Sequence, residues 1–188
     1  MVRSVADIVG GMPITTRRAG PEDAAELHDI AARTFPLACP PGTTDADISA
    51  FVSTHLSVER FRDYLADEHR TLLLAEADGV PVGYAMLVAG PIADADVRAV
   101  VHGKTSIELS KFYVALDSHG SGAASTLMAA TIEAAAATGA ETCWLGVNQR
   151  NVRAARFYDK SGFTVVGTKR FLVGAQWHDD HVRLRSLP

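Results

Sequence analysis

Apolar side chains recur along the chain in two periods, one of three to four residues and one of two. The longer period lines up one apolar stripe on a helix, and the shorter one places alternate side chains on one face of a strand. The longer period predicts helices over residues 22–34, 45–56, 58–66, 122–138 and 151–161. Alternation, together with runs of β-branched and aromatic residues, predicts strands over residues 14–18, 72–77, 82–88, 104–114, 142–147, 164–171 and 181–185.

The order of these segments predicts the fold class. The dipeptide Asp78-Gly79, between the second and third predicted strands, is a two-residue hairpin signal. After this hairpin, strands alternate with helices, which is typical of a mixed sheet in an α/β domain. The prolines and glycine of residues 35–45 predict a loop, whereas residues 91–103 are compatible with either a loop or a short helix.

Length and composition limit the function classes that remain open. With 188 residues, 47% of them hydrophobic, the chain can bury a sizeable core. We expect residues 13–188 to form a single domain after a flexible tail over residues 1–12. The net charge of −4 and the lack of a basic stripe argue against a nucleic-acid partner. No apolar run has the length of a signal peptide or a membrane span, so we expect no membrane partner.

The cysteines and histidines favour neither disulfide nor metal chemistry. Cys39 and Cys143 are far apart and have no redox or metal-ligand spacing, so we expect reduced thiols in a cytoplasmic protein. His178 and His181 flank two aspartates in the sequence HDDH, but this spacing matches no common metal site. We therefore expect no bound metal.

The stretch HGSGAAS, residues 119–125, lies between a predicted strand and an alanine-rich predicted helix. Glycine lets a ligand approach the backbone closely, and the amides at a helix N-terminus bind phosphate groups. On these seven residues alone, a pyrophosphate cradle for coenzyme A and a strand-to-helix turn without a ligand both remain open.

Two other phosphate-binding motifs fit this part of the chain poorly. A nucleoside-triphosphate loop at HGKT (102–105) requires glycine where Arg98 stands, and it requires a helix where a strand is predicted. The dinucleotide motif matches Gly120 and Gly122, but Ser125 replaces its third glycine. The next predicted strand also ends without the acidic residue that would hold a ribose.

Two blocks of sequence resemble the GNAT N-acetyltransferase superfamily. The stretch ELSKFYVALDSHGSGAASTLM resembles its central motif Arg/Gln-x-x-Gly-x-Gly/Ala, with His119, Gly122 and Ala124 at the fixed positions. The stretch NVRAARFYDKSGF, residues 151–163, resembles the block Asn-x-x-Ala-x-x-Phe-Tyr-x-x-x-Gly-Phe at every fixed position. The resemblance extends over residues 13–188, although the first hundred residues match only in the order of elements. In the family, the side chain of the usual Arg or Gln can contact the ligand. Because His119 stands there in this chain, the resemblance implies only backbone contacts at this position.

The resemblance implies a mixed, mostly antiparallel, twisted sheet flanked by helices, with splayed central strands. It also implies an acetyl-CoA-dependent N-acetyltransferase that moves an acetyl group directly to a primary amine in a ternary complex. The stretches ELSKFYV, WLGV-N-x-x-N and FLVG further resemble bacterial polyamine N-acetyltransferases, which implies a polyamine-like small-molecule acceptor. A protein or peptide amine as acceptor, and a non-catalytic sensor that binds coenzyme A, remain as alternatives. Exposed edge strands often pair between subunits, so a homodimer is a further expectation.

The resemblance implies that Tyr158 protonates the departing thiolate. A phenol, whose ordinary pKa is about 10, can donate a proton to a thiolate. The alternative is that Tyr158 is a core aromatic like its neighbour Phe157. Neighbours on a helix point about 100° apart, so one ring can fill the core while the other reaches the site.

Glu108 is the candidate general base, at a strand position where some superfamily members carry a catalytic glutamate. A carboxylate beside apolar neighbours has a raised pKa, which suits proton removal near neutrality. The alternative is that Glu108 forms an ion pair with Lys111 or Arg170 while an ordered water takes the proton. Strict alternation along this strand predicts that one face carries the side chains of Glu108, Ser110, Phe112 and Val114. The corresponding strand of the family carries a β-bulge, which would change the direction of the last of these side chains.

Coenzyme contacts are also implied by the resemblance. Asn151 has an alternative or additional role as a helix N-cap, and Arg156 has the alternative of a solvated helix side chain. The implied coenzyme-binding residues are Phe112, Tyr113, Val114, His119, Gly120, Ser121, Gly122, Ala123, Ala124, Asn151 and Arg156.

We expect acceptor specificity from the first two predicted helices, residues 35–47 and the last hairpin. Five acidic residues favour a negative field that attracts a cationic amine, or they are ordinary surface charges. They are Asp45, Asp47, Glu59, Asp179 and Asp180.

Overall fold

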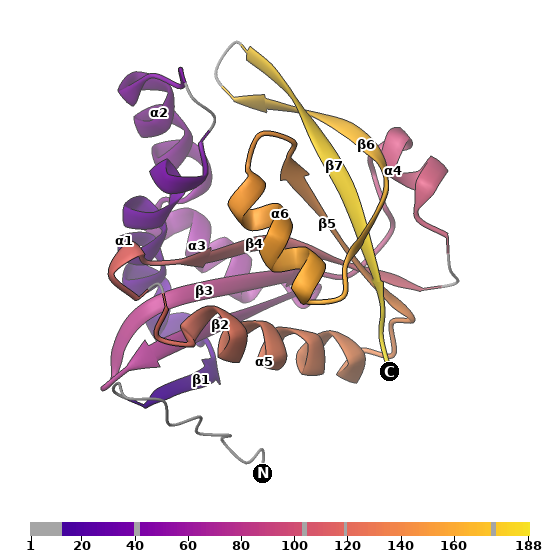
Figure 1. The fold of residues 1–188 in the computed structure, drawn as a ribbon. Helices are drawn as coiled ribbons and strands as arrows, with labels where there is room; N and C mark the ends of the chain where they lie inside the picture. The colour runs from indigo at the N-terminus through magenta and orange to yellow at the C-terminus, as the bar shows by residue number, and fades with distance from the viewer. Residues whose placement is uncertain (1–12, 40–41, 103–104, 119, 174–175) are drawn as a thin grey trace.

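The computed structural model describes residues 13–39, 42–102, 105–118, 120–173 and 176–188 (Figure 1). Three short 3-10 turns, η1 (Pro21–Asp23), η2 (Phe35–Ala38) and η3 (Leu116–Ser118), join longer elements. The helices are α1 (Ala24–Thr34), α2 (Asp45–His55), α3 (Val58–Ala66), α4 (Ala95–Val100), α5 (Ala123–Ala137) and α6 (Val152–Lys160). The strands are β1 (Ile14–Arg18), β2 (Arg70–Ala77), β3 (Val80–Val88), β4 (Ser106–Val114), β5 (Thr142–Asn148), β6 (Thr164–Val173) and β7 (Gln176–Ser186).

The structure confirms the predicted elements and changes three details. The undecided segment 91–103 contains the short helix α4, and the predicted loop 35–45 begins with the turn η2. The last two strands are longer than predicted, because β6 and β7 pair with each other from Thr164 and Leu184 to Val173 and Gln176. The residues added to β7, Gln176–Asp180, are mostly polar, so apolar alternation gives no signal for them.

All seven strands form one sheet in the order β1-β2-β3-β4-β5-β7-β6. The pair β4–β5 is parallel, and the other five pairs are antiparallel. The predicted mixed α/β fold is therefore confirmed. In the described chain, β4 and β5 pair only from Ser106–Glu108 to Thr142–Trp144, and beyond these residues the two strands diverge.

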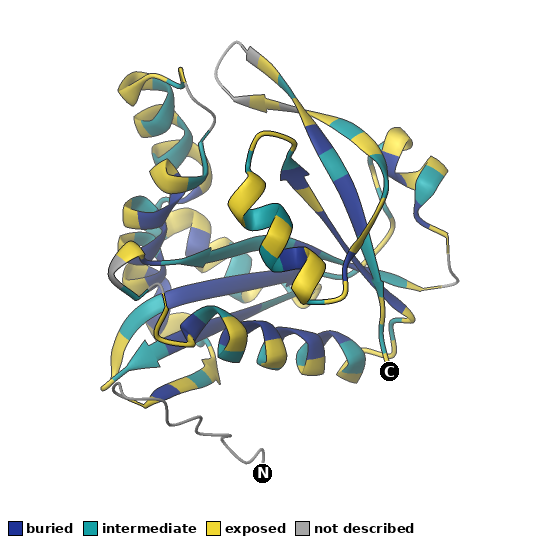
Figure 2. Ribbon diagram, in the orientation of Figure 1, coloured by how far each residue is buried: buried dark blue, intermediate teal, exposed yellow. Residues whose placement is uncertain are grey.

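Helices cover both faces of the sheet. On one face, α5 packs through Leu127 and Met128 against β1, β2, β3 and β4. On the other face, α1 and α3 pack through Leu27 and Phe61 against β2 and β3. The short helix α4 places Val97 in a third cluster, against β5 and β7. Five consecutive residues of β3 are buried as a result, which is typical of a strand covered on both faces (Figure 2).

The predicted hairpin between β2 and β3 has the backbone geometry of its sequence. Asp78 and Gly79 have φ angles of 49° and 76°, and a two-residue turn with positive φ at both positions matches the twist of the strands.

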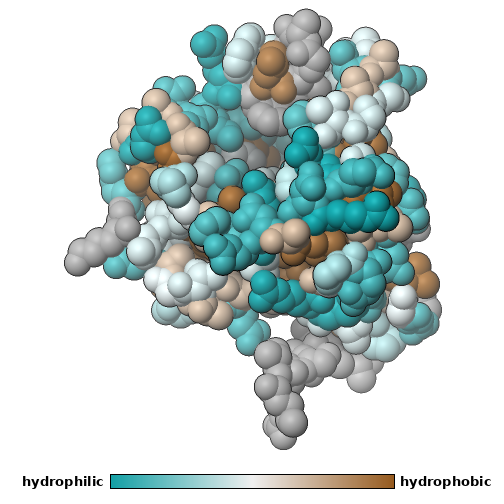
Figure 3. Space-filling view, turned by 180° about the vertical axis from the view of Figure 1, so that it is seen from behind, coloured by the Kyte–Doolittle hydropathy of each residue, from teal (hydrophilic) through white to brown (hydrophobic). Residues whose placement is uncertain are grey.

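The outer surface differs from this interior. Seen from behind, it is largely hydrophilic, with smaller hydrophobic areas between polar side chains (Figure 3). No helix in the described ranges has both the length and the apolar character needed to cross a membrane.

Candidate active site

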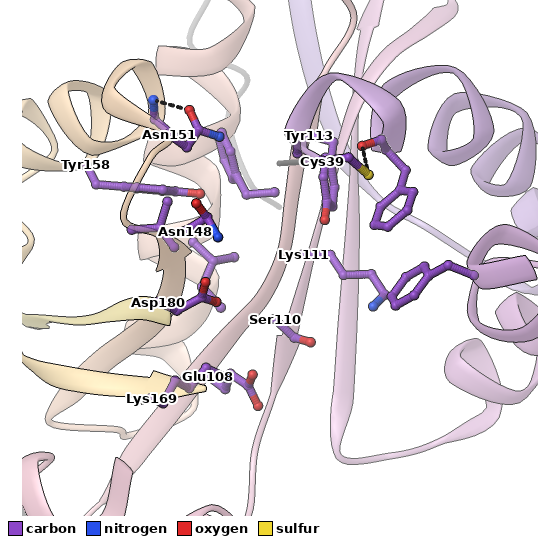
Figure 4. Close-up of a pocket in the computed structure, with 18 of the residues that line it drawn as sticks. Cys39, Glu108, Ser110, Lys111, Tyr113, Asn148, Asn151, Tyr158, Lys169 and Asp180 are labelled. Carbon is purple, nitrogen blue, oxygen red and sulfur yellow. Dashed lines mark hydrogen bonds between the residues drawn. The ribbon is translucent and has the colours of Figure 1, made fainter. Parts of the chain in front are cut away.

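A pocket of about 240 Å³ lies where β4 and β5 diverge (Figure 4). The turn η2 and α2 contribute to one side of it, and β5, α6, β6 and β7 contribute to the other, with β4 between them. Because the strands are unpaired here, backbone N–H and C=O groups of both strand edges face the gap. The polar and ionisable lining residues are Cys39, Glu108, Ser110, Lys111, Tyr113, Asn148, Asn151, Tyr158, Lys169 and Asp180.

A β-bulge in β4 decides which side chains share a face. In β3, Met86 and Leu87 are neighbours, but their partners in β4 are Lys111 and Leu109, so Ser110 is the extra residue. An extra residue reverses the alternation that follows it.

The bulge contradicts the prediction that Glu108, Ser110, Phe112 and Val114 share one face. Phe112 and Val114 pack with Leu109 in the cluster beneath α5 and α6. Glu108 lies on the opposite face, because it alternates with Ile107 and Leu109, which belong to that cluster. The gap therefore connects two faces of the sheet.

Tyr158 enters the gap from the α6 side. The residue is 8% exposed, its ring packs edge-on against Phe112 and Phe163, and its hydroxyl points into the pocket. Burial, followed by the nearby Tyr113 hydroxyl, raises the pKa of Tyr158 well above its ordinary value. The residue is thus both a core aromatic and a protonated donor at the pocket wall.

Two arginines of β7 hold α6 in place. Arg183 Nη1 donates to Asp159 Oδ1 at 2.6 Å, and the Arg183 side chain is 5% exposed. Arg185 Nη1 donates to the carbonyl oxygen of Ser161 at 2.5 Å. At the other end, Asn151 caps the helix by accepting from the Ala154 amide at 3.0 Å, as one of its two predicted roles requires.

Glu108 is half-buried on the opposite face. Loss of hydration raises its pKa, and Lys169, then Lys111, oppose this shift. Among the described residues, Glu108 forms no ion pair with either cation suggested by the sequence. Arg170 instead lies over the Trp177 ring, 5.0 Å from its centroid, and Lys111 lies 5.6 Å from the centroid of Tyr64. The position suits a carboxylate that titrates above its ordinary range.

The backbone at the start of α5 matches a phosphate cradle. Gly120 and Gly122 each have a φ of 89°, a left-handed conformation that side chains disfavour, and open space surrounds both positions where a Cβ would stand. Ser121 Oγ accepts from the Ala123 amide at 3.3 Å. The amide of Ala124, in the first turn, has no acceptor among the described residues. An anion with room to approach would complete this helix end.

The other expected coenzyme residues are spread around the same region. Phe112, Tyr113 and Asn151 line the pocket with Tyr158 and Glu108. Arg156 is exposed on the outer side of α6, and His119 lies outside the described residues. In the part of the chain described here, no three His, Cys, Asp or Glu side chains group as a metal site would require.

Comparison with known proteins identifies the family of the chain. The model of the acetyltransferase (GNAT) family matches residues 24–163, which include β4, the glycine turn, β5 and α6. The chain belongs to this family. Uncharacterized N-acetyltransferases of Mycobacterium tuberculosis and Mycobacterium bovis are 47% identical to the chain over 165 residues, covering 88% of it and 98% of each relative. The prediction of a GNAT N-acetyltransferase is therefore confirmed.

Solved structures agree on the fold of this GNAT protein. The PaiA N-acetyltransferase of Thermoplasma acidophilum, in complex with coenzyme A, is 20% identical with a TM-score of 0.73, covering 93% of this chain and 99% of that one. The ribosomal-protein-alanine N-acetyltransferase of Brucella melitensis is 23% identical with a TM-score of 0.67, covering 92% and 99%. At these identities the likeness establishes the fold, and it leaves the acceptor open.

The sequence did not predict that three side chains line the GNAT pocket, namely those of Lys111, Asn148 and Lys169. In the sheet, Asp180 of β7 lies opposite Lys169 of β6 on one side and opposite Asn148 of β5 on the other. Asn148 is the first asparagine of the stretch WLGV-N-x-x-N, but no role was predicted for it from the sequence. Of the five acidic residues expected near the acceptor, Asp180 lines the pocket and Asp45, Asp47, Glu59 and Asp179 do not.

Proposed function

We propose that this GNAT protein transfers the acetyl group of acetyl-CoA directly to the primary amine of a small molecule, in a ternary complex. The observation that carries the proposal is the gap between β4 and β5, which places Tyr158 and Glu108 in the walls of one pocket. Their positions suit a proton donor and a proton acceptor on the two sides of a reacting thioester.

The divergent strands suit the donor. The backbone groups of β4 beyond Glu108, on the side facing β5, lack a strand partner in the described chain. The amide-containing arm of coenzyme A matches such an edge, as an added strand does. The glycine turn and the first amides of α5 suit its pyrophosphate, since neither Gly120 nor Gly122 presents a side chain.

The chain's residues divide the proton transfers between them. Glu108 accepts a proton from the acceptor's ammonium group, because the free amine is the nucleophile. Unpaired amides of β4 polarise the thioester carbonyl. As the new C–N bond forms and the C–S bond breaks, the Tyr158 hydroxyl donates its proton to the departing sulfur. The new amide nitrogen loses its second proton to water, after which the phenolate of Tyr158 regains a proton from solvent and the protonated Glu108 releases its own.

The acceptor remains a primary amine in this proposal. The sequence resemblance favours a polyamine-like molecule, and a peptide amine is the other candidate. A non-catalytic module that binds coenzyme A would need neither the Tyr158 hydroxyl nor a half-buried carboxylate opposite it.

The test is an assay of free thiol released from acetyl-CoA over a panel of primary amines, with product masses determined. We expect one or more amines to gain a single acetyl group, and we expect Tyr158→Phe to lose this activity while it still binds coenzyme A. Coenzyme A binding without acetylation of any amine, including peptide amines, would identify a sensor instead.

A further inference from the structure

The charges of the pocket are balanced. Its charged lining residues in the described chain are two acids, Glu108 and Asp180, and two lysines, Lys111 and Lys169. An acceptor with several ammonium groups and no anion would meet two lysines in a partly dehydrated space. Like charges repel strongly where water is scarce. The arrangement therefore disfavours a polycation.

Asp180 is an incompletely satisfied carboxylate. The residue is 6% exposed, and its Oδ1 is buried without a partner among the described residues. Asn148 hydrogen-bonds the carboxylate, and Lys169 is the cation that acts on it most strongly. Lys169 also acts on Glu108, so this one lysine serves both carboxylates. Since a buried acceptor atom without a donor is costly, the site has room for one further N–H donor.

Lys111 is a cation that lacks an anionic partner among the described residues. It projects from β4 on the side of the pocket away from Asp180, and its ammonium group lies over the Tyr64 ring. The neighbouring Arg70 is paired with Asp67 at 2.9 Å, whereas Lys111 has no ion pair among the described residues. A half-buried ammonium group without an anion is unfavourable, so this wall has a position for a negative charge.

Apolar side chains line the same side of the pocket as Lys111. Phe35 and Phe51 are stacked with ring centroids 4.3 Å apart, and both line the pocket together with Leu56. Such a surface suits a short hydrocarbon segment.

We propose that the acceptor is an amine that also carries an anionic group, of the amino-acid class, with a hydrocarbon segment between its two ends. Asp180 and Glu108 receive the ammonium end, and Lys111 binds the carboxylate. The inference rests on the proposed function, because the ammonium end is the group that is acetylated. It departs from a polyamine-like acceptor, which the test includes as the opposite outcome.

The test uses three acceptors of equal chain length: an ω-amino acid, its neutral amide and the corresponding α,ω-diamine. We expect the native protein to show a kcat/KM for the amino acid about tenfold above that for the diamine. Lys111→Met should remove this preference by lowering kcat/KM for the amino acid more than kcat/KM for its neutral amide, and Lys111→Glu should reverse it in favour of the diamine. Arg62→Met is the matched control, since Arg62 is an exposed cation of α3 outside the pocket lining and its loss should change neither ratio.

A binding measurement separates this inference from the proposed function. Calorimetric titration of the protein with each acceptor, in the presence of coenzyme A, needs no turnover. Preference for the amino acid that disappears in Lys111→Met supports the inference even if acetylation fails. Tighter binding of the diamine, or no binding of any of the three, overturns it. An equal loss of kcat for all three acceptors in Lys111→Met also overturns it, because Lys111 would then act in the reaction rather than in recognition.

Discussion

The two faces of the sheet meet in one gap, and they bring different chemistry to it. The α5–α6 face contributes uncharged groups, the Phe112 ring and the Tyr158 hydroxyl, and the glycine turn lies at the start of α5 on this face. The opposite face contributes charged groups, with Glu108 and Lys111 from β4 and Asp180 from β7. The first face suits a ligand held through backbone amides, whereas the second suits a ligand selected by charge.

The family match covers the uncharged face of the gap completely and the charged face only in part, since it includes Glu108 and Lys111. The matched residues 24–163 contain the whole α5–α6 face of the gap but end before β6 and β7, which supply Lys169 and Asp180. A backbone cradle needs little beyond glycine and a helix start, so a short motif specifies it. Acceptor selection instead depends on side chains that pairing of distant strands brings together.

The largest effect is expected from the uncharged face, at Tyr158. Tyr158→Phe removes the proton donor and keeps the ring, so kcat should fall about 10²-fold while the affinity for coenzyme A stays nearly the same. Steady-state kinetics and calorimetry measure the two quantities. Tyr84→Phe is the control, because that hydroxyl is also buried, has no partner in the described chain and lies outside the pocket lining. Equal turnover of Tyr158→Phe and the native protein would leave Tyr158 as a core aromatic only.

The charged face should respond next, at Glu108. A base must be deprotonated, and burial raises the pKa of this carboxyl, so kcat/KM should rise with pH to a plateau that begins above the ordinary carboxyl range. Glu108→Gln should lower the plateau about tenfold or more and remove this acid limb. Glu133→Gln, at an exposed position of α5, should leave the profile unchanged. An acid limb that persists in Glu108→Gln would assign the base to another group, such as Asp180, whose pKa is raised by the same loss of hydration.

A third comparison tests the cradle itself. Gly122→Val places a branched side chain in open space where the pyrophosphate is expected, and the dissociation constant for coenzyme A should rise about tenfold. The positive φ of Gly122 also strains the valine backbone, so the control is Gly139→Val. Gly139 lies just beyond the C-terminal end of α5, has a φ of 80° and has similar open surroundings. Both variants should lose similar thermal stability, and only the first should lose affinity. Unchanged affinity in a folded Gly122→Val protein would move the cradle elsewhere.

The sequence predicted the uncharged face better than the charged one for physical reasons. The strand, glycine turn and helix around Gly122 are contiguous, so local pattern specifies them, and the hairpin at Asp78 is local as well. Whether Phe112 and Val114 share the face of Glu108 depends on a single extra residue, Ser110, for which alternation offers no signal. The approach of Lys169 to Asp180 depends on the register of β6 and β7, which polar strands specify weakly. The helix α4, with six residues, is too short for its period to be recognised.

The smallest expected effect is a pH dependence of acceptor preference. Dehydration lowers the pKa of Lys111 to about 8, with Glu108 opposing and Arg70 reinforcing the shift. The ammonium is charged below this pH and neutral above it. The ratio of kcat/KM for the ω-amino acid to that for its neutral amide should therefore be constant at lower pH and fall a few-fold as pH rises through about 8. Ionisation of the reacting amine nearly cancels in this ratio, because both acceptors carry it.

Of the other groups around Lys111, Glu108 on β4 faces the amine that both acceptors carry, so its ionisation nearly cancels in this ratio. Arginine side chains such as Arg70 on β2 stay charged in this range. His55 at the end of α2 is neutral, because burial lowers its pKa, and Tyr64 on α3 is neutral, because burial raises its pKa. Lys111→Arg should keep the ratio high beyond pH 8, since a guanidinium does not lose its proton there, and Lys111→Met should make it low at every pH. A fall near pH 8 that persists in Lys111→Met would assign the titration to another group and remove Lys111 from acceptor recognition.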